Sequence, residues 1–107
     1  MTNAPDISGL IARDADAAIA FLQTLVRVPS DNPPGDCAAH AEATAPLLER
    51  LGFTVERHPV PADVVRQNGM ISATNLVVRH RFGDGPTVAL NAHGDVVPPG
   101  EGWSTDP

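Results

Sequence analysis

The segment Thr87-Val-Ala-Leu-Asn-Ala-His-Gly-Asp-Val-Val-Pro98 decides the expected fold. In an extended chain its first residues, 87–92, are apolar or small on both faces, with Val88, Leu90 and Ala92 sharing one face. A strand that is apolar on both faces belongs in the middle of a sheet with helices on each side. The segment therefore predicts a central strand of a layered α/β domain.

Two further strands are predicted upstream of this segment. Thr74–Arg81 is one of them, and Gly83-Asp84-Gly85 after it is a strong tight-turn signal, so we expect an antiparallel hairpin with residues 87–92. Phe53–His58 is the other, because its residues alternate and prolines follow it, which marks a strand end or an edge position. Residues 62–72 connect the two strands, and we expect one helical turn there.

The first half of the chain has helical periodicity. Apolar residues at helical spacing predict a helix over Asp16–Val26, and Asp14 or Asp16 can cap its amino end. Residues 1–13 form a loose lead-in, since glycine and proline interrupt any longer period. Pro29–Gly35 is expected to be a loop, because proline disfavours helix at the residue before it.

A second helix is predicted over Asp36–Leu51. Pro46 lies inside it and removes one backbone donor, so a kink or a restart of the helix is expected. Gly52 is well placed as the left-handed residue after the cap, and Phe53 could then contact Leu48 in a Schellman arrangement. Two helices followed by strands predict an α/β fold, a three-layer α/β/α sandwich with a mixed sheet, in one small domain.

Composition excludes several classes of protein. The chain has 107 residues, a net charge of -6 and a pI near 4.9, and its cations are scattered arginines, so nucleic-acid binding is not supported. The single cysteine, Cys37, excludes an internal disulfide and any CxxC site, and it is most simply a small core residue. No apolar run is long enough for a membrane span, and we expect a cytoplasmic protein.

The chemistry of the chain gathers at His93-Gly94-Asp95, directly after the expected central strand. Residues i and i+2 of an extended chain point to the same side, so the imidazole and the carboxylate are expected side by side. A metal-ligating histidine is oriented by such a carboxylate, although Asp95 could also ligate a metal directly. The simpler interpretation of the triplet alone is a strand-to-loop turn in which Asp95 caps local amides.

No other residue completes a metal site by sequence alone, since such a site needs three or four protein ligands. His40, His58 and His80 are expected to be surface or otherwise satisfied histidines, and Glu101 a solvated loop carboxylate. Motifs of serine hydrolases, dinucleotide and nucleotide binders and zincins are absent from the sequence.

A resemblance to a known family changes this balance. Leu90–Pro98, followed by Trp103–Pro107, resembles the first metal-site motif of the co-catalytic zinc hydrolases. This peptidase family contains acetylornithine deacetylase, succinyl-diaminopimelate desuccinylase, aminoacylase and carboxypeptidase G. The segments Leu25–Gly35, Leu48–Glu56 and Thr74–Val78 resemble, in the same order, the loop, helix and strands that precede the motif in that family.

The resemblance implies roles for two residues. His93 matches the first metal ligand, and Asp95 matches the catalytic-site carboxylate that orients it. The family's remaining ligands, its glutamate base and its lid and dimerisation domain match nothing in residues 1–107. The implied chain is thus the incomplete amino-terminal part of a zinc-peptidase catalytic domain.

The implied function is that of the parent protein, and this chain alone is expected to be inactive. The parent would be a zinc-dependent amidohydrolase or metallopeptidase with two Zn²⁺ ions, for which Co²⁺ could substitute. It would cleave amide bonds of N-acyl amino acids or short peptides through a metal-activated water, and it would be a homodimer. The alternative is a non-catalytic binding or interaction module, or a truncated remnant.

Overall fold

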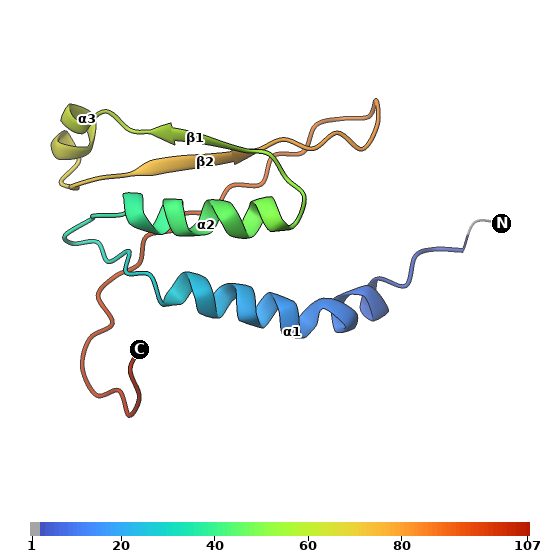
Figure 1. The fold of residues 1–107 in the computed structure, drawn as a ribbon, viewed down its shortest axis with the longest axis horizontal. Coiled ribbons are helices and arrows are strands. Elements are labelled where there is room, and N and C mark those ends of the chain that lie inside the picture. The colour runs from blue at the N-terminus through green and yellow to red at the C-terminus, as the bar shows by residue number, and fades with distance from the viewer. Residues whose placement is uncertain (1–2) are drawn as a thin grey trace.

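The computed structural model of the protein describes residues 3–107, so the first two residues of the expected lead-in lie outside the described part. Its elements follow in the order α1 (Ile7–Val26), α2 (Ala38–Arg50), β1 (Val55–Pro59), α3 (Ala62–Gln67) and β2 (Thr74–Val78) (Figure 1). Helices and strands are combined in one small unit, which confirms the α/β class. The helical turn expected in the connection between the strands is present as α3.

Helix α1 begins earlier than predicted. Asp6 is its N-cap, and the Asp6 side chain accepts a hydrogen bond of 2.9 Å from the amide of Gly9. A cap of this kind satisfies one of the free amides in the first helical turn. The predictions of a loose lead-in up to residue 13 and of a cap at Asp14 or Asp16 were therefore wrong. None of the helices in residues 3–107 combines the length and hydropathy that a membrane crossing requires.

The carboxyl end of α2 has the predicted form. Gly52 has a φ of +94°, its amide donates to the Glu49 carbonyl at 2.9 Å, and the amide of Phe53 donates to the Leu48 carbonyl at 3.3 Å. These are the two hydrogen bonds of a Schellman motif, so the cap at Gly52 is confirmed. The helix runs through Pro46 as one element, which excludes the restart considered from the sequence.

The sheet has a different partner arrangement from the predicted one. β1 and β2 pair antiparallel, with Val55 opposite Val78, so β2 pairs with the strand before α3 rather than with residues 87–92. The predicted hairpin is therefore wrong. α2 packs against both strands, and α1 packs against α2.

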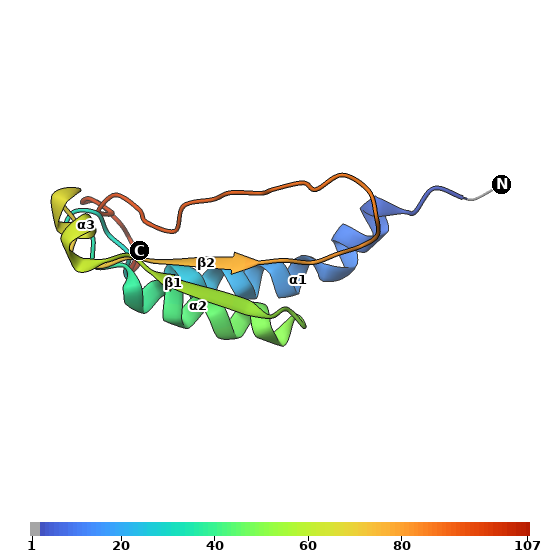
Figure 2. The same ribbon diagram turned by 90° about the horizontal axis from the view of Figure 1, so that it is seen from above.

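Residues 87–92 form no strand, although their composition predicts a buried one. Val88 is 80% exposed and Leu90 is 95% exposed. Figure 2 shows this segment running back along the molecule, apart from both strands of the sheet. An extended segment is stabilised by a hydrogen-bonded neighbour, and no part of residues 3–107 pairs with this one. The mixed sheet and the third layer are consequently not formed by the described residues.

The buried core is small and lies mainly on α2, which packs against both strands and α1. Its apolar members are Ala41, Ala45, Leu47 and Val65. Many large apolar side chains remain exposed, including Ile7, Ile11, Ile19, Leu22 and Val26 on α1. The chain therefore carries more apolar surface than its own residues cover.

Candidate functional site

The segment that carries His93 and Asp95 is held by the loop between α1 and α2. The amide of Val96 donates to the Ser30 carbonyl at 3.1 Å, and the amide of Asn32 donates to the Val96 carbonyl at 2.7 Å. Asp31 and Val96 thus form an isolated parallel β-bridge. Two stretches more than sixty residues apart in sequence meet here.

Side chains of the same loop reinforce this contact. The Ser30 hydroxyl donates to the Gly94 carbonyl at 2.8 Å, and Ser30 is only 5% exposed. The Asn32 side-chain amide donates to Oδ2 of Asp95 at 3.2 Å. The loop therefore fixes both the backbone and the carboxylate of the candidate site.

The loop is itself tied to the turn before β2. The carbonyl of Gly35 accepts hydrogen bonds from the amides of Ile71 and Ser72, at 3.0 and 3.1 Å. Gly35 has a φ of +78°, and a Cβ atom at this position would lie 2.9 Å from Cγ of Met70. Only glycine fits such a conformation at such close approach without a shift of its neighbour.

His93 and Asp95 form the side-by-side pair that their spacing predicts. Nδ1 of His93 lies 2.9 Å from the Asp95 carbonyl oxygen and 3.1 Å from Oδ1 of its carboxylate. When Nδ1 carries the proton, both oxygens accept from it and Nε2 keeps a free lone pair. The His93 side chain is 86% exposed, whereas that of Asp95 is 35% exposed. The His93 imidazole is thus exposed to solvent, and the Asp95 carboxylate that contacts it is partly buried.

The charge state of Asp95 follows from its partners. The hydrogen bond from Asn32 lowers the pKa of the Asp95 carboxyl below its usual value, with a further lowering from the bond to His93. Hydrogen bonds to the charged form of a carboxyl favour that form. Asp95 is therefore an anionic acceptor at neutral pH.

Cys37 has no sign of reactivity. Burial raises the pKa of its thiol, and the charges of Asp95, Asp36 and Asp31 raise it further. Its Sγ lies 3.6 Å from the Ser30 carbonyl oxygen, and the residue is half-buried as the N-cap of α2. A thiol with a raised pKa is a poor nucleophile and a poor metal ligand.

An open hollow of about 440 Å³ lies beside the pair. It is bounded by α2, by β2 and by residues 92–95, and its wall includes Cys37, His40, Leu48 and Leu76. Most of this wall is apolar, and the polar groups of the pair lie at one side of it. The hollow is a space next to the pair and not an enclosed pocket.

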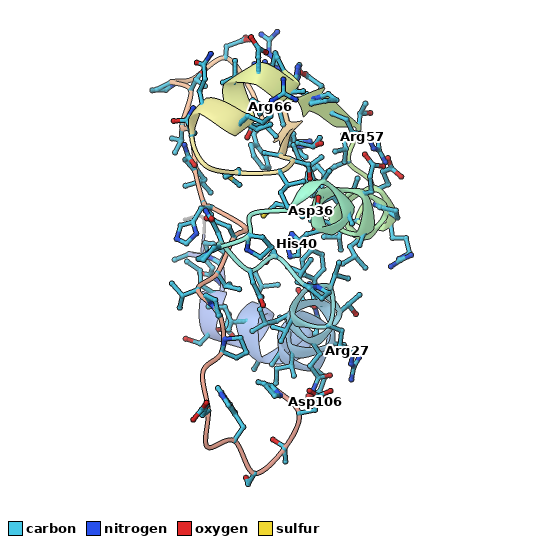
Figure 3. All side chains as sticks on the ribbon, turned by 90° about the vertical axis from the view of Figure 1, so that its left-hand side faces the viewer. Arg27, Asp36, His40, Arg57, Arg66 and Asp106 are labelled. Atoms are coloured by element: carbon cyan, nitrogen blue, oxygen red, sulfur yellow. The ribbon has the colours of Figure 1, made fainter. Side chains whose placement is uncertain are left out.

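His40 lies closer to the site than the sequence indicates. In Figure 3, His40 and Asp36 lie at the near end of α2, between the sheet and α1. A Cβ atom on Gly94 would be 3.3 Å from two atoms of the His40 ring, so the half-buried imidazole packs on the Gly94 backbone.

The other histidines lie away from the site. Nε2 of His58 is 2.9 Å from a carboxylate oxygen of Glu56, and His80 makes edge contacts with Phe53 and Phe82. Both are exposed, as the sequence predicts. Glu101 is an exposed loop residue.

The donor set fits one position of a metal centre. A neutral imidazole whose second nitrogen is held by a carboxylate is the usual arrangement of a zinc ligand and its orienting group. Within residues 3–107, however, no three histidine, cysteine, aspartate or glutamate side chains gather as a metal site. His93 and Asp95 therefore match one ligand position and its orienting group, and not a complete centre.

Sequence reasoning missed Ser30, Asn32 and His40. The sequence predicts a loop over residues 29–35, but no local pattern indicates that this loop contacts residues 94–96. A polar Ser-Asp-Asn run between prolines was the one available signal, and it carries no information on its partner.

Comparison with known proteins gives a consistent result. The chain is 41% identical over 85 residues to the succinyl-diaminopimelate desuccinylase of Rhizorhabdus wittichii, covering 79% of this chain and 20% of that protein. It is 58% identical over 91 residues to that of Wolinella succinogenes, covering 85% of this chain and 21% of the relative. For Gluconobacter oxydans the identity is 38% over 91 residues, covering 83% and 21%. No family model matches the chain, and no solved structure matches it significantly.

These relatives are all named succinyl-diaminopimelate desuccinylases, and each aligns with most of the chain. Over most of its length the chain is similar to succinyl-diaminopimelate desuccinylases, which confirms the resemblance found in its sequence. It spans about a fifth of the length of the curated relatives that it matches.

Proposed function

We propose that this chain is the amino-terminal part of the catalytic domain of a hydrolase that cleaves amide bonds of N-acyl amino acids or short peptides. The observation that carries the proposal is the His93–Asp95 contact of 3.1 Å, within a chain that aligns with desuccinylases. The names of the relatives suggest an N-succinyl amino acid, such as succinyl-diaminopimelate, as the substrate.

In this proposal His93 binds one metal ion through Nε2. Asp95 accepts a hydrogen bond from Nδ1–H, which fixes the tautomer and makes Nε2 a better electron-pair donor to a metal ion. Zinc, when bound, supplies Lewis-acid chemistry for hydrolysis, and cobalt can replace it. The low pKa of the Asp95 carboxyl keeps the acceptor charged at neutral pH.

The remaining parts of the function lie beyond residues 1–107. We propose that further chain supplies the ligands of a second metal ion, a carboxylate base and a lid domain that forms a homodimer. The whole protein is then a cytoplasmic enzyme. Residues 1–107 by themselves are then inactive and bind metal weakly, because one imidazole is far from a complete ligand set.

The test compares residues 1–107 with the protein extended to the length of the relatives. The extended protein should release succinate from N-succinyl-diaminopimelate with added zinc or cobalt, and residues 1–107 should not. His93→Ala in the extended protein should lose bound metal and nearly all activity. His58→Ala removes an exposed histidine that contacts Glu56 and should change neither. Unchanged metal content and rate in His93→Ala would refute the assignment.

The alternative of a stand-alone binding module requires a core that supports itself. In residues 3–107, only four apolar residues are buried while many large ones are exposed, which weighs against a stand-alone module. Urea unfolding of residues 1–107 decides between the two. A broad, non-cooperative transition is expected, whereas a sharp one would favour the module.

A further inference from the structure

We infer that Asn32 is a positioning residue of the candidate metal centre, because its side-chain amide holds the Asp95 carboxylate in the orientation that accepts from His93. The inference rests on the proposed function for its consequence. Its geometry stands on the described contacts alone.

Asn32 and His93 use different oxygens of the same carboxylate. The Asn32 amide donates to Oδ2 at 3.2 Å, and Nδ1 of His93 lies 3.1 Å from Oδ1. Because Asn32 holds Oδ2, Asp95 cannot rotate about its last side-chain bond without losing a hydrogen bond. The two contacts together fix the plane of the carboxylate and, through it, the imidazole.

The Asn32 side chain is itself held in place. Its backbone amide donates to the Val96 carbonyl at 2.7 Å, directly beyond Asp95 in the chain. A Cβ atom at Gly35 would lie 3.1 Å from Oδ1 of Asn32, so the amide oxygen packs against the Gly35 backbone. The NH₂ group consequently faces Asp95.

The hydrogen bond between Asn32 and Asp95 should have only a moderate effect on metal affinity. The Asp95 carbonyl oxygen, 2.9 Å from Nδ1 of His93, remains as an acceptor if the carboxylate turns away. Loss of a group that orients a metal ligand typically costs 10- to 100-fold in metal affinity. Loss of Asn32, which acts one step further away, should weaken Co²⁺ binding by roughly 3- to 10-fold.

Two substitutions separate positioning from a role in loop shape. Asn32→Ala removes the amide, and Asn32→Asp keeps its size and shape but replaces the donor with a charge that repels Asp95. Asn91→Ala and Asn91→Asp make the same changes at an exposed residue near His93 and serve as matched controls. Circular dichroism verifies that each variant keeps its helices.

The first readout is the tautomer of His93 in the metal-free protein extended to the length of the relatives. It is measured by ¹⁵N NMR at a fixed pH above the range in which imidazoles titrate. The starting protein should carry the proton on Nδ1, and both Asn32 variants should shift toward a mixture of tautomers, with the Asn91 variants unchanged. The second readout is Co²⁺ affinity, which should fall in Asn32→Ala.

The outcomes distinguish the inference from the proposed function. If both Asn32 variants keep the Nδ1 tautomer and Asn32→Ala keeps the Co²⁺ affinity of the starting protein, Asn32 does not position Asp95 and the inference is overturned. If the tautomer depends on Asn32 but His93→Ala binds Co²⁺ as well as the starting protein does, the positioning contact stands and the metal function fails.

Discussion

Residues 36–78 and residues 79–107 contain similar apolar side chains but differ in what surrounds them. Val77 lies in β2, opposite Glu56 of β1, and is half-buried. Val88 lies in an equally apolar stretch and is 80% exposed. The difference is the presence of a paired neighbour, since a strand is stabilised by its cross-strand contacts more than by its own composition.

The overall dimensions express the same contrast. The radius of gyration is 17.3 Å and the extents are 55 × 39 × 20 Å, whereas a compact domain of 100 residues has a radius of gyration of about 13 Å. The amino-terminal part of α1 and the chain after β2 project from the packed part (Figure 1). Residues 3–107 therefore fold around one small core, and the segments at both ends of the chain extend away from it.

The largest expected effect comes from the core. In residues 1–107, Leu47→Ala removes a side chain that is 8% exposed, and the lost packing should accelerate amide exchange in α2 roughly 30-fold, the local equivalent of about 2 kcal/mol. Leu90→Ala, at 95% exposure, should stay within about 0.5 kcal/mol. Hydrogen exchange measured by NMR on both variants tests the contrast. Equal effects would mean that residues 87–92 are packed in solution.

A smaller effect is expected at the helix end. Gly52→Ala places a side chain at a φ of +94° and should cost about 1 kcal/mol, which is close to a fivefold faster exchange of the Phe53 amide. Gly85→Ala is the matched control in the open region, because its φ is not left-handed and no atom lies near its Cβ position. If Gly85→Ala accelerated amide exchange as much as Gly52→Ala does, the helix cap at Gly52 would not be the cause of the effect.

The smallest effect concerns the junction between the two regions. Ser30→Ala removes the hydroxyl that donates to the Gly94 carbonyl and should cost about 1 kcal/mol or less. Exchange of the Val96 amide should rise up to about fivefold, with no change inside α2. Thr24→Ala removes a hydroxyl bonded within α1 and should leave Val96 unaffected. Unaltered Val96 exchange in Ser30→Ala would show that the Ser30 hydroxyl does not help to hold residues 94–96.

The sequence by itself determined the features that depend on near neighbours. The cap at Gly52 follows from a glycine after an apolar helix, and its hydrogen bonds span only a few residues. The contact between His93 and Asp95 follows from i, i+2 geometry in an extended chain. Both belong to short stretches whose conformation limits the available partners.

Only the tertiary structure decided the contacts between distant segments. No local pattern indicates that β2 pairs with β1 instead of residues 87–92, or that Asn32 meets Asp95 across the chain. The start of α1 at Ile7 was also missed, because the cap at Asp6 outweighs a nearby glycine. Apolar composition predicts that a segment can be buried, but burial requires a surface to pack against, and residues 87–92 have none among the described residues.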